Sequence, residues 1–339
     1  MGMNTWRILL FPFSLIYALV TSTRNKLFDW GILKSHHISI PSIGVGNLSV
    51  GGTGKSVVVD FLISSFRGKS RIAVLSRGYG RETKGVVVAD QTSSASTIGD
   101  EPFQFYSKYS GIEVVVAEKR VRGIKKMIQM NRQLDLILLD DVLQHRSISP
   151  SIMLLTTTYD QPFFSDTLLP VGNLRELKSG AKRAEIIIVT KCPNKLTQDQ
   201  MDVFAVKLNL NPNQQLFFTK IKYSSTIQNT TTKLLLKDLK NDFILVTGIA
   251  NPSPLVQYLK GLNLHFQHLE FPDHHVFSSS DISRIKMMSQ NGLVITTEKA
   301  FTRLRPLIEN KTLFYLPISM EFLHPKMATQ FKDALIKRL

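Results

Sequence analysis

Cysteine is nearly absent from this sequence, since Cys192 is the single one. One thiol cannot build an intramolecular disulfide framework, and it cannot supply a zinc cluster made of cysteines. The sequence therefore excludes a small disulfide-stapled secreted domain and favours a chain that stays in a reducing, cytosolic compartment. It also lacks internal repeats and low-complexity tracts, which excludes a repeat array.

Acidic residues are scarce relative to basic ones. The chain has 42 Lys and Arg against 26 Asp and Glu, a formal net charge of +16. This excess predicts attraction to nucleic acid, a membrane lipid or a phosphorylated substrate, and charge alone does not decide among them. The 43% hydrophobic and 20% charged shares exclude a disordered or fibrous chain, and 339 residues suffice for one large or two ordinary domains.

Long apolar runs are lacking too. The longest almost uncharged one, Ile8 to Val20, contains Pro12, and as a helix it covers about 20 Å of a hydrocarbon core of roughly 30 Å. We therefore predict that it does not span a membrane. Cationic and aromatic side chains flank it, a pattern typical of a helix in a membrane interface, so residues 1–40 are predicted to be an amphipathic, membrane-associated segment. The alternatives are a cleaved signal peptide and an apolar helix packed on its own domain.

From residue 41 onward, short β-branched apolar runs alternate with helical stretches. This pattern predicts an α/β fold with a parallel sheet covered on both faces. The predicted strands are Ser42 to Val45, Ile72 to Leu75, Val114 to Ala117, Leu136 to Leu139, Ile152 to Leu155 and Ile186 to Val189. After a polar stretch, a second set follows at Phe243 to Val246, Leu293 to Ile295 and Leu313 to Leu316.

A glycine-rich segment follows the first predicted strand and precedes the helical stretch Val57 to Phe66. That context is typical of a loop whose backbone N–H groups and helix N-terminus bind phosphate. The predicted nucleotide-binding residues are Gly51, Gly52, Thr53, Gly54, Lys55 and Ser56. In such loops the lysine reaches the β- and γ-phosphates and the following hydroxyl ligates Mg²⁺. Ser49 occupies the position of the usual first glycine.

An acidic pair, Asp140 and Asp141, ends the strand Leu136 to Leu139. Coupled to the phosphate loop, Asp140 is predicted to hold Mg²⁺, and Asp141 to orient a neighbour or face the substrate. A GTPase usually reads guanine with N/T-K-x-D at the end of a late strand. Here Pro193 stands in the aspartate position of Thr190-Lys191-Cys192-Pro193, so ATP is the expected nucleotide.

We therefore predict a P-loop NTPase-like core domain over residues 41–221. Residues 222–240 form a linker or small hairpin that acts as a hinge, and residues 241–339 form a second, smaller α/β domain that serves as a lid. The competing function at this level is a P-loop ATPase switch or maturation factor that acts on a protein partner.

In an ordered series of motifs, the chain resembles the bacterial tetraacyldisaccharide 4'-kinase family, also called lipid A 4'-kinases. The motifs are residues 45–56, Ser76-Arg77-Gly78-Tyr79-Gly80, Gly99-Asp100-Glu101-Pro102, Asp140-Asp141 with Gln144-His145-Arg146, Leu169-Pro170 with Gly172 and Leu174-Arg175-Glu176, Asp273-His274-His275 with Phe277, and Thr297-Glu298-Lys299. Two motifs depart from the family pattern. Val142-Leu143 replaces the usual Gly-Phe, and Ala300 replaces a common aspartate, so Glu298 and Lys299 stay outside the predicted catalytic set.

The resemblance implies transfer of the ATP γ-phosphoryl group, with Mg²⁺, to the 4'-hydroxyl of a tetraacylated disaccharide 1-phosphate, giving lipid IVA. It implies peripheral or monotopic attachment to the cytoplasmic face of the bacterial inner membrane. It also implies an Asp–His dyad, so Asp100 and His274 are the predicted catalytic residues together with Lys55, and either member of the dyad is a candidate for taking the proton. Glu101 is predicted to assist Mg²⁺. The predicted substrate-binding residues are Asn47, Arg77, Arg120, Asp141, Gln144, His145 and Arg175.

Basic residues also cluster between Lys119 and Lys126. Neither interleaved aromatic residues nor a recognised nucleic-acid module accompanies them. We therefore expect no nucleic-acid partner, and no obligate protein partner is evident from the sequence.

Overall fold

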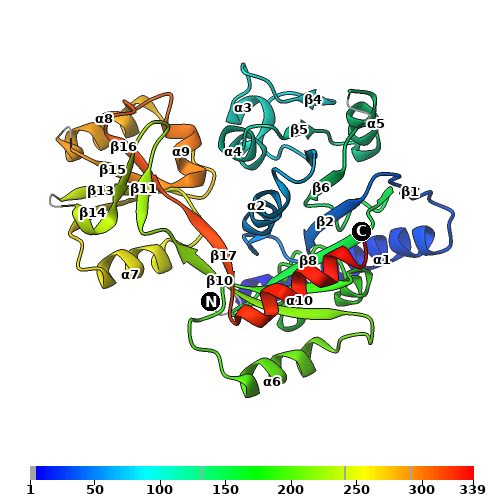
Figure 1. Cartoon of the computed structure of the whole chain (residues 1–339). Coiled ribbons are helices and arrows are strands. Elements are labelled where there is room, and N and C mark those ends of the chain that lie inside the picture. The colour runs from blue at the N-terminus through cyan, green and yellow to red at the C-terminus, as the bar shows by residue number, and fades with distance from the viewer. Residues whose placement is uncertain (1–4, 131–132, 240–241, 291) are drawn as a thin grey trace.

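Two sheets organise the chain, as Figure 1 shows for the computed structural model, which describes residues 5–130, 133–239, 242–290 and 292–339. The larger sheet has the strand order β17-β10-β9-β8-β2-β6-β3-β5-β4. Its strands are β2 (Ser42–Asn47), β3 (Ile72–Ser76), β4 (Val87–Val88), β5 (Glu113–Val116), β6 (Leu136–Asp140), β8 (Ile152–Thr158), β9 (Ile186–Thr190), β10 (Gln215–Tyr223) and β17 (Ile318–Phe322). Pairing is parallel in the interior and antiparallel at both edges, β10 with β17 and β5 with β4.

Helices cover both faces of this sheet because its strands are apolar on both sides. Along β3, Ile72 and Val74 pack in a cluster with α2, whereas Ala73 and Leu75 pack with α5. The helices of this part are α2 (Lys55–Phe66), α3 (Ala95–Ile98), α4 (Asp100–Lys108), α5 (Arg120–Met130), α6 (Gln198–Leu208) and α10 (Pro325–Ile336). The predicted mixed α/β fold with a parallel sheet is confirmed.

The smaller sheet has the order β12-β11-β16-β15-β13-β14, with parallel pairing from β16 to β14. Its strands are β11 (Thr226–Gln228), β12 (Lys233–Leu235), β13 (Phe243–Thr247), β14 (Phe266–Glu270), β15 (Val294–Thr297) and β16 (Leu313–Leu316). Its helices are α7 (Ser253–Gly261), α8 (Ser279–Ser289) and α9 (Glu298–Leu304). Two further cores, separate from those of the larger sheet, lie under these elements.

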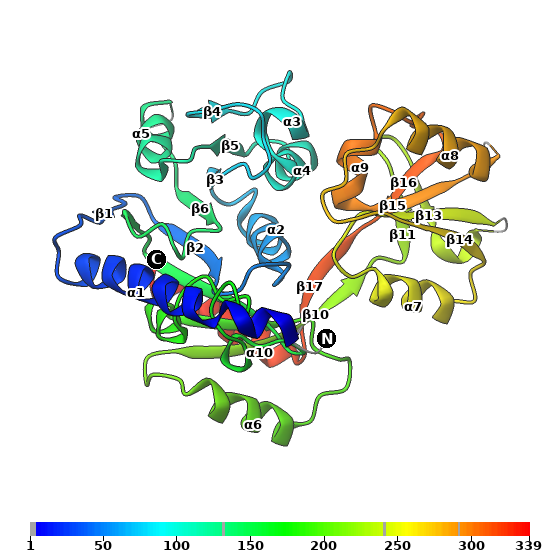
Figure 2. The ribbon, with the colours of Figure 1, turned by 180° about the vertical axis from the view of Figure 1, so that it is seen from behind.

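The smaller sheet belongs to a segment placed between two neighbouring strands. The chain leaves the larger sheet along β10 and returns along β17, with Tyr223 opposite Ile318. We call residues 224–317 the inserted unit and the remainder from residue 36 the core unit; Figures 1 and 2 show them side by side, joined by β10 and β17. The sequence-based division kept residues 241–339 together, whereas β17 and α10 pack on the larger sheet. Residues 222–240 contain the antiparallel pair β11–β12, and their role as a hinge stays a prediction.

The N-terminal segment is a short 3₁₀ turn, η1 (Thr5–Leu10), that continues into α1 (Phe11–Asp29). The stretch Trp6–Asp29 has 24 residues, and its most apolar 18-residue window has a mean hydropathy of 1.4 and is 6% buried. By length and composition it is therefore long enough to cross a membrane, although the apolar run alone was too short. The remaining short elements are β1 (His36–His37), which pairs with β7 (Ile148–Ser149), and the turns η2 (Phe163–Ser165), η3 (Lys178–Arg183) and η4 (Leu236–Asp238).

Polar side chains attach α1 to the core unit along one face of the helix, and Figure 2 shows α1 lying across that unit. Ser14 Oγ donates to the Leu169 carbonyl (3.0 Å), Tyr17 Oη to the Arg175 carbonyl (2.8 Å), and Asn25 to Glu176 (2.8 Å). The apolar side chains point the other way and are exposed: Leu9, Phe11, Phe13, Leu15, Ile16, Leu19 and Val20. The helix therefore presents a polar face to the protein and an apolar face outward.

Candidate active site

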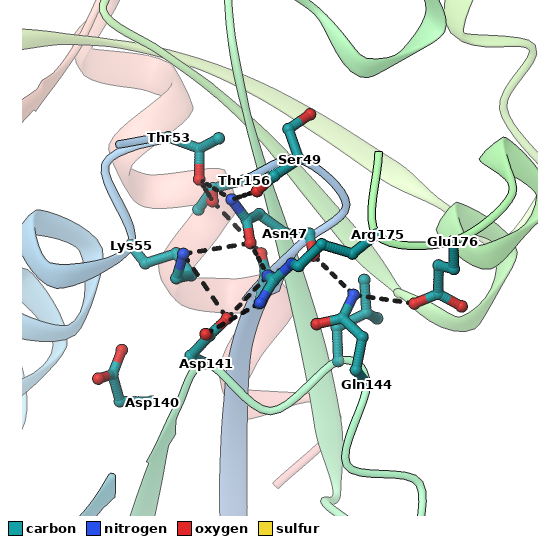
Figure 3. Close-up of polar contacts among 12 residues, drawn as sticks. Asn47, Ser49, Thr53, Lys55, Asp140, Asp141, Gln144, Thr156, Arg175 and Glu176 are labelled. Carbon is teal, nitrogen blue, oxygen red and sulfur yellow. Dashed lines mark hydrogen bonds and ion pairs between the residues drawn. The ribbon is translucent and has the colours of Figure 1, made fainter. Parts of the chain in front are cut away.

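The phosphate loop connects β2 to α2, and Figure 3 shows its polar contacts. Gly51 and Gly54 have φ angles of 107° and 84°, which a side chain would strain, whereas Ser49 does not take a positive φ. Asn47 Nδ2 closes the loop by donating to the Ser49 carbonyl (2.7 Å) and to Thr53 Oγ1 (2.8 Å). The loop therefore does not require glycine at residue 49.

Lys55 begins α2 and lies within the loop. Its Nζ donates to Asn47 Oδ1 (3.1 Å) and lies 3.6 Å from Asp141 Oδ1. Arg175 contacts both oxygens of Asp141, at 3.0 and 2.9 Å. Burial acts to raise the pKa of Asp141, but Lys55 and Arg175 outweigh it and hold the pKa below its usual range. Two cations thus converge on one carboxylate at the mouth of the loop.

Asp140 ends β6 with its side chain directed toward the same region (Figure 3). Ser76 Oγ donates to its Oδ2 at 2.9 Å. Burial, followed by the nearby charges of Asp141 and Glu101, raises the pKa of Asp140 to about 6. Burial and two neighbouring acids therefore disfavour the negative charge of Asp140 in this structure.

This arrangement fits a Mg²⁺ ion. The oxygens of Asp140, Glu101 and Ser56 are hard ligands of the kind that Mg²⁺ prefers, and a dication would offset the negative charge that burial disfavours on Asp140. Within the described residues, no cluster of three or more His, Cys, Asp or Glu has the arrangement of a metal site. Mg²⁺ in phosphoryl-transfer sites usually has one or two protein carboxylates and takes its other ligands from phosphate and water. The donor set is compatible with that mode.

Asp100 and His274 meet across the boundary between the two units. Asp100 begins α4 of the core unit, His274 belongs to the inserted unit, and His274 Nδ1 lies 2.8 Å from Asp100 Oδ2. Burial acts to raise the pKa of Asp100, but hydrogen bonds from His274 and Arg303 outweigh it and leave the pKa lowered. The two residues lie 174 positions apart in the sequence, and the fold brings them together.

Helix α9 supplies two cations to this pair that the sequence analysis did not include. Arg303 Nε donates to Asp100 Oδ1 (2.6 Å), and its Nη2 contacts Asp100 Oδ2. Lys299 Nζ lies 2.8 Å from His274 Nε2 and 2.9 Å from Asp273 Oδ1. Lys299 was left out because Ala300 departs from the family pattern. Arg303 lies outside every motif, and no signal in the sequence distinguished it.

The other predicted substrate-binding residues have different environments. Arg77 is exposed beside the site, whereas Arg120 is 1% exposed. The Arg120 guanidinium contacts the Ala117 carbonyl and, at 3.4 Å, the Asp140 carbonyl, and burial lowers its pKa to about 10. Arg120 therefore contacts the carboxyl end of β6 in this structure, and its contact with substrate stays a prediction.

Gln144 and His145 follow the acidic pair. Gln144 Nε2 donates to the Asn47 carbonyl and to Glu176 Oε1, both at 2.9 Å. Burial, followed by the charge of Arg120, lowers the pKa of His145 to about 4. Gln144 thus joins the phosphate loop to the segment around Arg175, while His145 is held in its neutral form at neutral pH.

The departure at Val142-Leu143 is accommodated by glycines of β2. Both side chains are buried, at 1% and 2% exposed. A Cβ at Gly44 would lie 2.8 Å from Val142 Cγ1, and one at Gly46 would lie 2.5 Å from Leu143 Cβ. Because the two glycines leave that room, the turn after the acidic pair packs closely with a larger residue at 142 and a smaller one at 143 than the family usually has.

Comparison with known proteins identifies relatives over nearly the whole chain. The family model described as Tetraacyldisaccharide-1-P 4'-kinase matches residues 6–338. A protein from Flavobacterium johnsoniae named tetraacyldisaccharide 4'-kinase is 45% identical over 95% of this chain and 94% of its own length. One of the same name from Bacteroides thetaiotaomicron is 41% identical over 93% of this chain and 88% of its own.

A solved structure agrees with these matches. The crystal structure of LpxK from Aquifex aeolicus in complex with ATP superposes with a TM-score of 0.79 at 26% identity, covering 98% of this chain and 99% of that one. The sequence motifs, the joined Asp100 and His274, and these matches lead to one conclusion: the chain belongs to the tetraacyldisaccharide 4'-kinase family.

Proposed function

We propose that this protein transfers the γ-phosphoryl group of ATP to the 4'-hydroxyl of a tetraacylated disaccharide 1-phosphate, a precursor of lipid A, to form lipid IVA. The observation that carries the proposal is the contact between Asp100 at the start of α4 and His274 of the inserted unit. We infer that this pair accepts the proton at the carboxyl edge of the sheet that carries the phosphate loop. An ATP-driven switch acting on a protein partner is not favoured, because the relatives are named tetraacyldisaccharide 4'-kinases.

The core unit would bind the nucleotide. The N–H groups of residues 51–56 and the ammonium of Lys55 would contact the phosphates, and Ser56, Asp140 and Glu101 would hold Mg²⁺. Bound Mg²⁺ neutralises charge on the phosphate oxygens. Lys55 contacts Asp141 in the structure, so we infer that phosphate replaces this carboxylate as its partner when ATP binds.

The pair Asp100–His274 would act on the acceptor. As the new bond forms between the 4'-oxygen and the γ-phosphorus, the bond from that phosphorus to the leaving ADP oxygen breaks, and the hydroxyl proton passes to the pair. A carboxylate that holds an imidazole in one tautomer makes it a better base. Arg77 and Arg175 are guanidinium groups suited to anionic oxygens of ATP or of the lipid 1-phosphate.

The inserted unit would act as a lid. Lys299 lies 3.5 Å from Glu101 of the core unit, and Arg303 contacts Asp100 beside it. Strands β10 and β17 connect the two units. We infer that bending at this connection opens the site for substrate and closes it to exclude water, which would otherwise hydrolyse ATP.

Membrane association follows from a lipid substrate and from the outward apolar face of α1. We propose that α1 lies in the cytoplasmic leaflet of the inner membrane, with its polar face on the core unit. Tyr17 and Asn25 contact Arg175 and Glu176. The helix would therefore hold this edge of the candidate site close to the lipid headgroups.

The decisive experiment incubates the protein with labelled ATP, Mg²⁺ and the disaccharide lipid in detergent and analyses the lipid product. Lys55→Ala is expected to reduce lipid phosphorylation by roughly 10²–10³-fold, as for other lost preorganised donors. Lys69→Ala removes an exposed lysine just beyond the far end of the same helix and should have no effect. A folded Lys55→Ala protein with full activity would refute the assignment, and ATP hydrolysis without a phosphorylated lipid would favour the switch.

A further inference from the structure

Lys299 lies at the boundary between the two units and has no chemical role in the function proposed above. It belongs to the first turn of α9, and Figures 1 and 2 show α9 on the side of the inserted unit that faces α4. Its ammonium lies 2.8 Å from His274 Nε2 and 2.9 Å from Asp273 Oδ1, both in the inserted unit. It also lies 3.5 Å from Glu101 Oε1 of the core unit. One cation of the lid therefore lies close to the histidine of the proton-accepting pair and to an acid of the candidate metal site.

These contacts place the ammonium beside the path of the transferred phosphoryl group. In phosphoryl transfer, the leaving oxygen and the attacking oxygen lie roughly in line on either side of the phosphorus. In the proposed reaction, the leaving oxygen lies on the side of the phosphate loop and Glu101, and the attacking oxygen lies beside the pair Asp100–His274. Because Lys299 is close to residues on both sides, the phosphorus between them passes within reach of its ammonium.

Of the two cations that α9 supplies, Lys299 is the one that can turn to a phosphate. Arg303 contacts both oxygens of Asp100 and donates to the His275 carbonyl, so groups of the protein already occupy its guanidinium. A lysine ammonium can donate more hydrogen bonds than the two close contacts of Lys299 use. Its side chain is also flexible, so the ammonium can move while the helix stays in place.

One partner of Lys299 is an atom that the acceptor hydroxyl needs. Asp100 contacts His274 at Nδ1, so Nε2 is the ring nitrogen that remains for the substrate. Without substrate, the ammonium of Lys299 lies on Nε2. When the hydroxyl takes this position, the ammonium loses that partner, and the nearest new anion is the phosphoryl group that the hydroxyl attacks.

We propose that Lys299 is a catalytic residue that contacts the γ-phosphoryl group of ATP during its transfer, in addition to Lys55 of the phosphate loop. The negative charge of this group is spread over its equatorial oxygens in the transition state, and fixed cations beside them accelerate transfer. The inference rests on the proposed lipid kinase function and adds a residue of the lid to its catalytic set. Because Lys299 belongs to the inserted unit, this cation acts only when the two units are together.

The departure from the family pattern at Ala300 is compatible with this role. Ala300 is 3% exposed, and its N–H donates to Thr297 Oγ1, which caps the start of α9. The backbone that carries Lys299 is therefore held in place without the aspartate that is common in the family at residue 300.

The test compares two nucleotides that differ only in the γ-phosphate, ATP and ADP. Calorimetry with Mg²⁺ and without lipid measures their binding to the full-length protein in a His274→Ala background, where the contact with Nε2 is absent. In that background, Lys299→Ala is expected to weaken ATP binding about tenfold, the effect of one charge-assisted hydrogen bond, and ADP binding less than about twofold. With His274 intact, Lys299→Ala should lower kcat for lipid phosphorylation by roughly 10²–10³-fold. Lys299→Arg keeps a cation and should recover part of both losses.

Lys286→Ala, which removes an exposed lysine of α8 in the same unit, is the matched control and should keep the ratio of ATP to ADP affinity. Equal losses for ATP and ADP in Lys299→Ala would overturn the proposal, since Lys299 would then support the site as a whole. An unchanged ratio would overturn it as well, and a lower kcat beside it would mean that Lys299 acts through His274. A preference for ATP that depends on Lys299, in a protein that phosphorylates no lipid, would support the contact and refute the proposed function.

Discussion

Asp140 and the nearby His145 affect the stability of the protein in opposite directions as pH changes. Asp140 has a pKa of about 6 in the folded protein, above its ordinary 3.8. Between those values the folded state holds a proton that the unfolded chain has lost, so stability falls as pH rises through this window. His145 has a folded pKa of about 4, below its ordinary 6.5. Between those values the unfolded chain binds more protons, so stability rises with pH.

Asp140→Asn should therefore be more stable than the parent at pH 7 in Mg²⁺-free buffer, by up to about 3 kcal/mol. The replacement removes the buried carboxylate. Of the two groups, only His145 then changes the stability with pH, and it makes the stability rise as pH rises. Urea unfolding between pH 4 and 7 measures both effects. The parent should give a flatter profile over this range than Asp140→Asn.

The reverse variant supplies the control for this prediction. His145→Gln removes the increase of stability with pH that His145 provides. The stability of this variant should therefore decline more steeply than that of the parent between pH 4 and 6. Identical slopes for the parent and both variants would show that neither group titrates as described.

The sequence predicted the position of single site residues where these residues belong to one continuous motif. The phosphate loop and Asp140 are of this kind, because strand, turn and helix N-terminus follow one another along the chain. Arg303 contacts Asp100 across 203 positions, and nothing local distinguishes it from the exposed Arg305 nearby. Contacts made only by tertiary structure leave no pattern in one sequence.

Helix α9 is expected to act on the reaction through Asp100. Arg303→Gln should lower kcat by roughly 10²-fold with little change in KM for ATP, because the positioned base loses a partner. Arg303 is also one of the groups that lower the pKa of Asp100. The acidic limb of the kcat–pH profile should therefore move to higher pH, which a purely structural loss would not cause.

Arg305→Gln changes an exposed arginine two residues further along the chain and serves as the matched control for this helix. Arg303→Lys keeps the charge but not the two-pronged contact, and it should recover only part of the activity. If Arg303→Gln has the pH profile of the parent, Arg303 does not act through Asp100.

Helix α9 is also connected to α2, the helix that begins with Lys55, through Lys108 of α4. Lys108 of α4 lies 2.9 Å from Asp60 of α2 and 3.0 Å from Glu298 of α9, and the side chains are 20%, 10% and 8% exposed. Burial acts to lower the pKa of Lys108, but the two carboxylates outweigh it and raise it above its ordinary value. Lys108→Met should destabilise the protein by roughly 3–5 kcal/mol, since it leaves two buried acids without their cation. Urea unfolding measures the loss.

The triple variant Lys108→Met, Asp60→Asn and Glu298→Gln removes the charges together and should regain most of that stability. Lys119→Met, at an exposed lysine just before α5, controls for loss of a surface charge. A triple variant no more stable than Lys108→Met would show that the ion cluster is not the cause.

At the scale of elements, the buried parallel strands were predicted best. β2, β3, β6, β8 and β9 are apolar on both faces and read as continuous runs. The strands missed are short or mixed in polarity, such as β4 at an edge and β14, whose exposed and buried residues alternate irregularly. The placement of β17 on the larger sheet depends on its antiparallel partner β10, which the local sequence of β17 does not specify.

For the whole molecule, we predict that the outward apolar face of α1 determines membrane binding. Ile16 and Leu19 are 61% and 69% exposed, and each buried apolar side chain is worth about 1.5–3 kcal/mol. The double variant Ile16→Ser and Leu19→Ser should therefore weaken binding to anionic vesicles at least tenfold and raise KM for lipid, with ATP affinity unchanged. Vesicle sedimentation measures binding. Deleting the helix is a poorer test, because Tyr17 contacts Arg175.

The double variant Val203→Ser and Val206→Ser removes two exposed apolar side chains from α6 and should sediment like the parent. Equal losses in the two double variants would mean that binding depends on total surface hydrophobicity. Unaltered sedimentation of Ile16→Ser and Leu19→Ser would show that α1 serves the core unit alone.

The packing of α10 links the phosphate loop to a segment that is made much later in synthesis. Val58 and Leu62 of α2, the helix that begins with Lys55, share a core with Phe331 and Leu335 of α10. A ribosome delivers residues in order from the N-terminus, and the inserted unit is translated before α10. We infer that a nascent chain binds no nucleotide until α10 has been made. A premature stop codon just before Pro325 would then abolish activity while every motif remained intact.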